Sequence, residues 1–457
     1  MKKASWMIAL LILLCSVFWL HADWQILKQT HWHPIRSGLL QLTGILSITL
    51  FSLTMILAMR FRWVDAITTG LDKSYRLHKW SAIFALVFAL VHWLLALVPK
   101  MLVQRGLLER PIKSMASQPA ENIDSIMQWL HQMRPMAEQM GDIGIKLMIL
   151  LMIAALLKRL PYHWFQWSHK LMALLYLAFV VHTVILLKPS YWDQPITWLT
   201  LLFVIVGSLC AVASLLGKVG NAQRYQGRIR HISHRHGVTA LTVHLPRWPG
   251  HQSGQFAFIR LAGEKAHPFT ITSSAAPSTT GALNAHQLRF SIKALGDFTG
   301  SLPTMIQSHD LVENDQVEIE GPYGQFDFDT HTNSQSEQIW IAGGIGIAGF
   351  LAKLEERAKL NSVQPQVTLY FCTQDASRTQ INQLAHQARI ANVDFHLIDN
   401  RKQPLLTIST LEDNHPQFAQ ASIWFCGPAN FAKALAQQLK AKQFAMQRFH
   451  REYFEFR

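Results

Sequence analysis

Long apolar segments crowd the first half of this chain and constrain its fold more than any other feature. Six of them could cross a bilayer, at about 4–20, 37–59, 77–98, 143–157, 164–187 and 196–216. Residues 218–457 have the composition of an ordinary soluble protein. We therefore expect a multidomain membrane protein, with a six-helix transmembrane bundle followed by a globular half.

The first segment has two readings. Met1-Lys-Lys precedes an apolar run that ends near Leu20, which fits either a span or a cleaved signal peptide. No clean small-x-small cleavage site follows, and this favours the span.

Basic residues predict the orientation. In a six-span arrangement those near the span ends fall on one side: Lys2, Lys3, Arg60, Arg62, Lys73, Arg76, Lys158, Arg159, Lys218 and Arg224. The positive-inside rule makes that side the cytoplasm. We expect a multi-pass protein of the cytoplasmic (inner) membrane, with the globular half inside and the 99–142 connection outside. The net charge of +14 owes much to this rim, and nothing suggests nucleic acid.

Two spans carry the same histidine pattern. His78 and His92 lie 14 residues apart in one span, and His169 and His182 lie 13 apart in another. These spacings correspond to rises of about 21 and about 20 Å. Ionisable residues inside a membrane are functional candidates by default. The matched heights predict axial ligands for two stacked haems, His78 with His169 on the inner side and His92 with His182 on the outer.

The rotation of the second helix is less simple. Thirteen residues turn a side chain about 140° from its starting face, so this helix must meet the two haems from different sides or bend. The alternative is that all four are interface histidines, hydrogen-bonded to neighbouring helices.

The four cysteines do not form a metal-like or disulfide pattern. Cys15, Cys210, Cys372 and Cys426 are scattered between apolar and globular regions. Electron carriers, if present, would be haem and flavin.

The globular half changes pattern once. Short alternating runs from about Arg228, such as 237–244 and 255–260, predict a small antiparallel β-barrel. After a polar linker at 331–337, apolar strands alternate with helical stretches, which predicts an α/β dinucleotide-binding domain. The expected strands are 338–342, 367–372, 394–398 and 422–426, with a helix near 350–360. The expected domains are 1–217, 224–329 and 336–457.

A glycine loop follows the first of these strands. Gly344-x-Gly346-x-x-Gly349 has the spacing that lets a backbone approach a pyrophosphate at a helix N-terminus. A simple tight turn is the alternative.

Two further stretches carry a family resemblance. His267-Pro-Phe-Thr270 ends a barrel strand, and Ser291-Ile-Lys-Ala-Leu-Gly-Asp-Phe-Thr299 lies downstream. Together with the duplicated histidine pairs, they resemble the ferric reductase / NADPH oxidase superfamily. The resemblance implies a ferric-reductase-like transmembrane domain, then a ferredoxin-NADP reductase-like module of FAD barrel and NAD(P)-binding domain. It also implies FAD, two haem b groups, and NADPH or NADH as the electron source.

The resemblance assigns roles to individual residues. Those that would line FAD are His267, Pro268, Phe269 and Thr270, with Thr270 near the reactive ring nitrogen. Those that would hold its pyrophosphate are Lys293, Gly296 and Thr299. Those that would contact the nicotinamide dinucleotide are Gly343, Gly344, Gly346 and Ile347, with Cys426, Gly427 and Pro428 closing over its ring.

The C-terminal tail would cover the flavin. Phe454 is the expected aromatic and Phe456 the alternative, and an ordinary edge strand is the other reading of this segment. Thr270, Cys426 and Phe454 are then the candidate catalytic residues.

Some positions depart from the family pattern or leave a choice open. Ala348-Gly349 replaces a frequent Thr-Pro after the glycine loop. Asp375 suits the free ribose of NADH and Arg378 the phosphate of NADPH. Ala96 stands where animal NADPH oxidases have a histidine, which weakens a dedicated superoxide role. Arg36 could pair with a haem propionate or with a lipid head group.

The implied function is a transmembrane flavohaem oxidoreductase that reduces a ferric chelate or O2 on the outer face. One alternative is an electron donor to a periplasmic protein or a quinone, docking on the 99–142 loop. Methionines give this loop an adaptable apolar character and, more remotely, a copper-binding role: Met115, Met127, Met133, Met136 and Met140. Another alternative is a transporter or haem-binding protein with a nucleotide-sensing domain.

Overall fold

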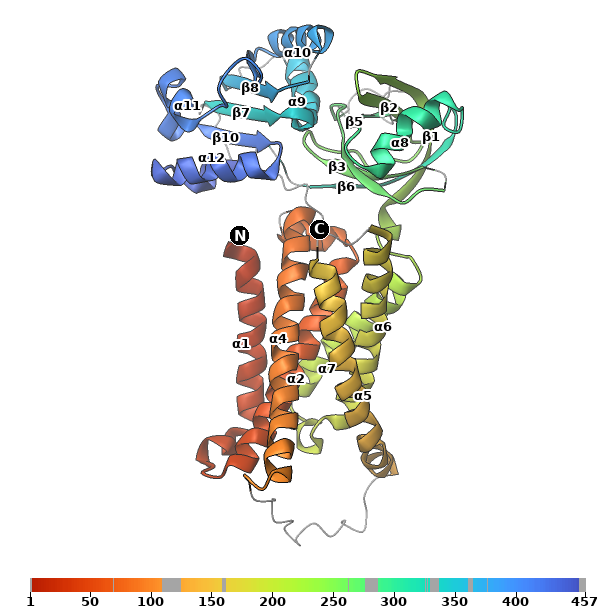
Figure 1. The fold of residues 1–457 in the computed structure, drawn as a ribbon, viewed down its shortest axis with the longest axis vertical. Coiled ribbons are helices and arrows are strands. Elements are labelled where there is room, and N and C mark those ends of the chain that lie inside the picture. The colour runs from red at the N-terminus through yellow and green to blue at the C-terminus, as the bar shows by residue number, and fades with distance from the viewer. Residues whose placement is uncertain are drawn as a thin grey trace. The chain divides into compact units, whose positions relative to one another are not determined.

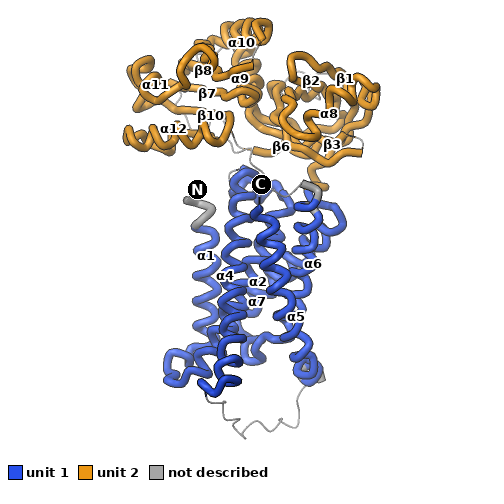
Figure 2. Tube along the Cα trace, viewed as in Figure 1, with its two compact units in different colours: residues 1–219, 457 blue, residues 220–456 orange. Residues whose placement is uncertain are grey.

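The chain forms two compact units, residues 1–219 and 220–456 (Figure 2). The computed structural model describes residues 2–68, 70–108, 125–157, 162–261, 263–275, 287–324, 326, 328, 337–360, 365–375 and 377–451. Each unit has its own hydrophobic core and is considered separately.

The first unit is a bundle of long helices that lie side by side (Figure 1). Its helices are α1 (Lys2–Ala22), α2 (Trp32–Ala58), α3 (Arg62–Thr68), α4 (Leu71–Gln104), α5 (Ser125–Leu156), α6 (Tyr162–Leu186) and α7 (Pro195–Leu215). Among the described residues, the five helices α2, α4, α5, α6 and α7 are long and apolar enough to cross a membrane. Helix α1 contributes a shorter apolar stretch, Trp6–Ala22.

Two helices extend beyond the predicted spans. Helix α4 continues to Gln104 and α5 begins at Ser125, so much of the expected 99–142 loop is helical. Pro99 and Pro135 lie inside these helices. A proline usually ends a helix in a soluble protein, but membrane helices tolerate it because neighbouring groups satisfy the freed carbonyl. Of the loop methionines, Met115 lies outside the described residues.

Exposed tryptophans mark both ends of the bundle. Near the starts of α1, α4 and α6 and the end of α2 they are Trp6, Trp80, Trp164, Trp167 and Trp63. Near the end of α1 and the starts of α2, α5 and α7 they are Trp24, Trp32, Trp129 and Trp198. Tryptophan is enriched at both membrane–water interfaces, so the two sets fit the borders of a bilayer.

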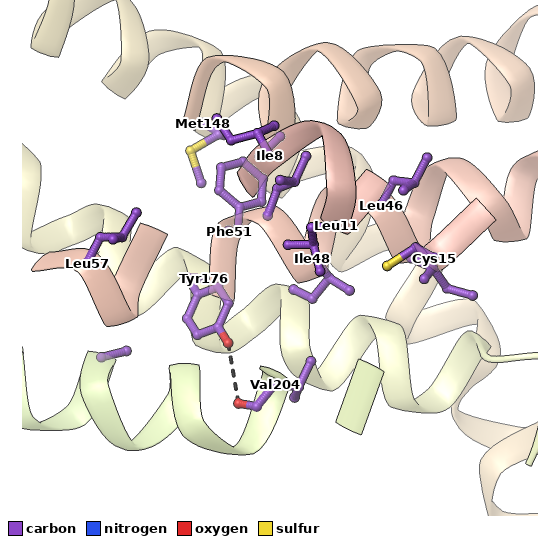
Figure 3. Packing of buried hydrophobic residues seen from close by; sticks show 14 of the residues in the cluster. Ile8, Leu11, Cys15, Leu46, Ile48, Phe51, Leu57, Met148, Tyr176 and Val204 are labelled. Carbon is purple, nitrogen blue, oxygen red and sulfur yellow. Dashed lines mark hydrogen bonds between the residues drawn. The ribbon is translucent and has the colours of Figure 1, made fainter. Parts of the chain in front are cut away.

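Helix α2 is the centre of this bundle. It packs against α1, α4, α6 and α7, and its apolar window is more buried than those of the other spans. Hydroxyl side chains are tolerated inside it because they bond helix carbonyls: Thr43 donates to Leu39, Ser52 to Ile48, and Ser47 across to Ala85 on α4. The shared core includes Phe51, Tyr176 and Val204 (Figure 3).

The second unit begins with an antiparallel barrel. Its elements are β1 (Arg224–Arg235), β2 (Val238–His244), β3 (Phe256–Leu261), β4 (His267–Thr270), β5 (Gln287–Lys293), α8 (Asp297–Gln307) and β6 (Gln316–Tyr323). The strand order is β4-β3-β6-β1-β2-β5, and a bridge between Ile271 and Phe290 nearly closes the ring. The predicted barrel is confirmed.

A parallel sheet follows in the same unit. Its elements are β7 (Gln338–Gly343), α9 (Ala348–Lys359), β8 (Val367–Thr373), α10 (Arg378–Ile390), β9 (Asp394–Asp399), α11 (Ile408–Asn414), β10 (Ser422–Cys426), α12 (Ala429–Ala441) and β11 (Phe449–Arg451). The strand order is β11-β10-β7-β8-β9. The chain adds β8 and β9 on one side of β7 and then β10 and β11 on the other side, so the order of addition reverses at β7 although all strands are parallel. The predicted α/β domain is confirmed. Ligands of such sheets bind where the order reverses, at the carboxyl ends of the strands.

The start of the C-terminal tail is an edge strand. Phe449–Arg451 pairs in parallel with β10, as the alternative reading of this segment predicted. Phe454 and Phe456 lie outside the described residues, so their expected contact with the flavin stays a prediction. The three domain boundaries also stay a prediction.

One hydrogen bond in the bundle core provides a test of its packing. The Tyr176 hydroxyl lies 2.8 Å from Ser52 Oγ and donates to the Val204 carbonyl at 3.3 Å. We expect Tyr176→Phe and Ser52→Ala each to lower the free energy of unfolding by about 1 kcal/mol. The double variant should show a coupling of about 0.6 kcal/mol in detergent unfolding.

The matched control pairs Tyr176→Phe with Ser47→Ala, because Ser47 bonds Ala85 instead. Those two effects should add. Additive effects for Tyr176 and Ser52 as well would contradict the packing described.

Candidate functional site

The four histidines of the bundle meet in two pairs. The ring centres of His78 on α4 and His169 on α6 lie 5.9 Å apart. Those of His92 on α4 and His182 on α6 lie 6.1 Å apart. The different rotations expected for the two α6 histidines therefore do not prevent either pairing.

Hydrogen bonds define the tautomer of three of these rings. The Nδ1 atoms of His78, His92 and His182 lie 3.0, 2.9 and 2.7 Å from the carbonyls of Thr54, Leu40 and Ala137. A carbonyl only accepts, so each Nδ1 carries the proton and donates it. The Nε2 atom of each neutral ring is then left with a free lone pair, the form that binds a metal.

The ring of His169 is held differently. Its Nδ1 is buried without a hydrogen-bond partner in the described part of the chain. Phe165, one turn earlier on α6, stacks on the ring with centres 5.2 Å apart and planes 21° apart. Packing, instead of a carbonyl, orients this fourth imidazole.

The spacing of both pairs fits an iron between the rings. With about 2 Å for each metal–nitrogen bond and about 1 Å from each nitrogen to its ring centre, two axial imidazoles stand about 6 Å apart. Within the described residues, no three His, Cys, Asp or Glu side chains converge on a metal position. The pairs therefore suit an iron whose other ligands come from a macrocycle, as in haem.

Arg36 lies near the His92–His182 pair. Its Nε donates to the Leu95 carbonyl at 2.7 Å, three residues after His92 on α4. Pro99, four residues after Leu95, has no amide hydrogen to occupy that carbonyl. The structure thus shows a backbone partner for Arg36 that neither sequence-based reading anticipated.

The His-Pro-Phe-Thr motif forms strand β4. The rings of His267 and Phe298 stack with centres 4.1 Å apart and planes 6° apart, and the ring centre of Phe269 lies 6.4 Å from that of Phe298. Phe298 belongs to α8, so the barrel brings the two sequence motifs together. Partial burial lowers the pKa of His267 below its usual value, which favours the neutral ring.

The second motif caps helix α8. The Thr299 hydroxyl accepts from the amides of Leu295 and Gly296, both at 2.9 Å. An added Cβ on Gly296 would meet nothing within 4 Å, so the space above the helix start is open. Helix N-termini of this kind favour anionic groups such as a pyrophosphate.

The glycine loop lies at the reversal point of the parallel sheet. Gly344 has a φ of +55°, a conformation that favours glycine. An added Cβ on Gly343 would lie 2.8 Å from Pro428 Cδ, and one on Gly346 would collide with the Cys426 carbonyl oxygen. The structure therefore brings the predicted residues together at the ends of β7 and β10: Gly343, Gly344, Gly346, Ile347, Cys426, Gly427 and Pro428.

A cleft joins this loop to the barrel. Lys293 on β5 lines it together with Gly344, Ile347 and Asp375. The Lys293 ammonium donates to the Asp375 carboxylate at 2.8 Å, and this bond lowers the pKa of Asp375 below its usual range. Arg378 is the first residue of α10, shortly after Asp375. The choice between the two as the residue that contacts the ribose side of the nucleotide stays open. Lys293 contacts the nucleotide domain as well as belonging to the flavin motif.

Polar contacts hold α9 against the barrel. Glu355 pairs with Arg289, Ser253 donates to Glu356 at 2.5 Å, and Lys359 donates to Ser274 at 2.8 Å. Partial burial alone would raise the pKa of Glu355, but Lys359 and Arg289 hold it below its usual value. These contacts orient the helix that follows the glycine loop.

Comparison with known proteins identifies both units. Residues 43–180 match the family described as "Ferric reductase like transmembrane component", and residues 234–327 match "FAD-binding domain". The first match contains His78, His92 and His169, and the second contains both barrel motifs. The chain belongs to the ferric reductase / NADPH oxidase superfamily, and it is a multi-pass membrane protein with a FAD-binding domain.

Curated relatives agree with this membership. The chain is 25% identical over 236 residues to "Respiratory burst oxidase homolog protein E" of Arabidopsis thaliana, covering 47% of this chain and 23% of the relative. It is 33% identical over 154 residues to "Ferric reduction oxidase 8, mitochondrial" of the same plant, covering 32% and 19%. It is 21% identical over 433 residues to "Dual oxidase 2" of Sus scrofa, covering 79% and 26%. The chain thus spans about a quarter or less of the length of these relatives.

Sequence reasoning missed the partners of the predicted residues. It did not anticipate the carbonyls of Thr54, Leu40 and Ala137, because backbone acceptors carry no sequence signal. It also missed the stacking of Phe298 on His267, although Phe298 lies within the quoted motif. The histidine pairing itself was readable from the matched spacings.

Gly346→Ala tests the nucleotide surface. The new Cβ would displace the loop from the Cys426 carbonyl, and we expect the affinity for NADPH and NADH to fall at least about tenfold. Titration of the FAD-loaded protein measures this, with FAD content unchanged. Gly300→Ala on α8 is the matched control because its Cβ meets nothing within 4 Å. Unaltered nucleotide affinity in Gly346→Ala would contradict the assignment.

His251 gives the second unit a pH-dependent stability. Its Nδ1 accepts from Trp248 at 3.3 Å and its Nε2 donates to the Ser273 carbonyl at 2.9 Å. Burial lowers the pKa of His251 below the usual 6.5. As the pH falls, the imidazole therefore gains its proton in the unfolded protein before it does in the folded protein. The contribution of His251 to folding stability is complete above the unfolded pKa of about 6.5 and declines below it.

His251→Gln keeps a donor and an acceptor but does not titrate. We expect the unfolding temperature of this variant to fall less than that of the wild type between about pH 7.5 and about pH 5.5. Equal losses in the two proteins would show that His251 is not held neutral.

Proposed function

We propose that this chain moves electrons from NAD(P)H through FAD and two b-type haems to an acceptor on the opposite side of the membrane. The proposal depends above all on two pairs of imidazoles in the bundle. The ring centres are 5.9 Å apart in the His78–His169 pair and 6.1 Å apart in the His92–His182 pair. The FAD-binding domain and the glycine surface of the parallel sheet support its other half. When bound, FAD takes a hydride from the nicotinamide, and haem iron carries electrons singly.

The residues of the second unit would bind and orient the two nucleotides. His267, Pro268, Phe269 and Thr270 would line FAD, with the Thr270 hydroxyl at the reactive edge of its ring. Gly296 and Thr299 would hold its pyrophosphate at the start of α8, with Lys293 nearby on β5. Cys426, Gly427 and Pro428 would exclude water over the nicotinamide, and Phe454 would cover the flavin from the tail.

The residues of the first unit would fix the two haems in the bundle. His78 with His169, and His92 with His182, would each supply two imidazoles to one haem iron and so would leave the acceptor no open position on it. The acceptor would therefore meet a haem edge instead of binding iron. The relatives are named as a respiratory burst oxidase, a ferric reduction oxidase and a dual oxidase, and the acceptor we propose is a ferric chelate or O2.

The orientation follows from charge. Arg60, Arg62, Lys73 and Arg76 lie at the end of the bundle that holds His78 and His169. By the positive-inside rule this end faces the cytoplasm of an inner membrane. We therefore assign His78 and His169 to the inner haem and His92 and His182 to the outer one. The domains at 1–217, 224–329 and 336–457 form part of the same proposal.

Anaerobic visible spectroscopy tests the path. Adding NADPH, then NADH, to the haem- and FAD-loaded protein should produce sharp reduced b-type bands, and the faster nucleotide is the physiological one. Admitting O2 or a ferric chelate then ranks the acceptors by the rate of reoxidation. A protein that binds FAD and is reduced by NAD(P)H but shows no haem band would refute the path.

Single histidine variants test the order of the two haems. His182→Ala should lose the outer haem and keep the inner one, so NAD(P)H still reduces haem but reoxidation slows at least about tenfold. His78→Ala should instead abolish haem reduction by the nucleotide. The matched control is His131→Gln, an exposed residue on α5. Equal behaviour of the His78 and His182 variants would refute the order.

A further inference from the structure

Two glycines in membrane helices face the outer histidines. An added Cβ on Gly44 of α2 would lie 3.1 Å from both Nδ1 and Cε1 of His92. One on Gly141 of α5 would lie 2.7 Å from Nδ1 of His182 and closer still to Cε1. Each glycine thus lies against the Nδ1–Cε1 edge of its ring, and the added Cβ on Gly141 would also lie 3.3 Å from Nε2 of His182.

The same glycines stand four residues after the carbonyls that these rings bond. His92 donates to Leu40, four before Gly44, and His182 donates to Ala137, four before Gly141. In a helix the residue at i+4 lies directly above the carbonyl of residue i. Its amide takes one lone pair of that carbonyl, and the second is reached past its side chain. When the residue at i+4 is glycine, no side chain blocks the second lone pair of the carbonyl oxygen, and an imidazole can reach it.

His78 also donates to a carbonyl that is followed four residues later by a small residue, here an alanine. His78 donates to Thr54 at 3.0 Å, and the residue four positions later is Ala58. In the described part of the bundle, the carbonyls of Thr54, Leu40 and Ala137 accept from His78, His92 and His182, and each is followed at i+4 by a residue with at most one side-chain carbon. The bond is shortest, at 2.7 Å, opposite Gly141.

Close packing alone does not account for these glycines. Glycine costs a helix interior about 1 kcal/mol relative to alanine, and membrane helices accept that cost where they approach closely. Gly144, one turn after Gly141 on α5, is such a case: its Cβ would lie 2.7 Å from Phe179 on α6. Gly44 and Gly141 differ because the atoms they admit belong to histidine rings bonded to their own helices.

We propose that Gly44 and Gly141 are positioning residues for the outer haem. Each opens a helix carbonyl to the Nδ1 proton of an axial histidine, and this bond directs Nε2 toward the iron and sets the plane of the ring. The proposal rests on the proposed haem ligation and adds a cause for its geometry. Because the two carbonyls belong to different helices, the planes of His92 and His182 lie 79° apart, against 47° for His78 and His169.

Electron paramagnetic resonance of the oxidised, haem-loaded protein reads these ring planes. Near-perpendicular axial imidazoles give a more anisotropic low-spin signal than rings closer to parallel, so the wild type should show two distinct signals. In Gly141→Ala the more anisotropic signal should shift or vanish while the other stays. The reduction potential of the same haem should rise, because a histidine that loses its carbonyl partner is a less basic ligand. Haem affinity at that site should fall about 10- to 100-fold.

Gly144→Ala is the matched control. It crowds the same helix interface by a similar amount without touching a histidine, so it should lower thermal stability but keep both signals and both potentials. Gly44→Ala, with the added Cβ at 3.1 Å, is the milder variant and keeps the test decisive if Gly141→Ala does not assemble. It should alter the same signal by a smaller amount.

Three outcomes would overturn the inference. Unchanged signals and potentials in both Gly44→Ala and Gly141→Ala would show that the glycines only pack. An equal change in Gly144→Ala would show a general effect of crowding. A wild type without haem would remove the proposed function and this inference together, whereas two haems that ignore both glycine variants would remove this inference alone.

Discussion

The hydrogen bond from a histidine Nδ1 to a helix carbonyl is the interaction on which the transmembrane unit depends. In a bilayer no water is present to bond a polar ring, and three of the four imidazoles bond a helix carbonyl instead. Thr54 and Leu40 on α2 and Ala137 on α5 provide these carbonyls. Because a carbonyl can only accept, the bond leaves Nε2 unprotonated. One contact thus satisfies the ring, fixes its tautomer and ties α4 and α6 to their neighbours.

In the proposed function, the second unit would hold two nucleotides against each other. The barrel brings β4 and the start of α8 together through His267 and Phe298. The parallel sheet brings the glycine loop against Cys426 where its strand order reverses. Glu355, Glu356 and Lys359 on α9 bond barrel residues, so the helix after the glycine loop is oriented by the barrel. This arrangement fits a transfer that depends on the mutual orientation of two bound rings.

Much of the fold was readable from the sequence because periodicity and length are local signals. Strand β10 begins at Ser422 and ends at Cys426, as predicted, and the barrel precedes the parallel sheet, as expected. Helices α4 and α5 extend beyond the predicted spans 77–98 and 143–157 because those spans were read from apolar runs, whereas the helices continue through polar residues such as Lys100 and Gln132. The histidine pairs were readable because their spacings match. Their carbonyl partners were not, because the register between two helices is set by packing that no single segment encodes. Lys293 and Asp375 illustrate the same limit, since they lie 2.8 Å apart across 82 positions of sequence.

The central claim is that each pair of facing imidazoles holds one haem iron. Near-infrared magnetic circular dichroism of the oxidised, haem-loaded protein tests it most directly, because the ligand-to-iron charge-transfer band reports the two axial ligands. We expect bands for bis-imidazole, low-spin iron alone, with no high-spin component. A high-spin component, or a band for histidine paired with water or methionine, in the fully loaded wild type would contradict it.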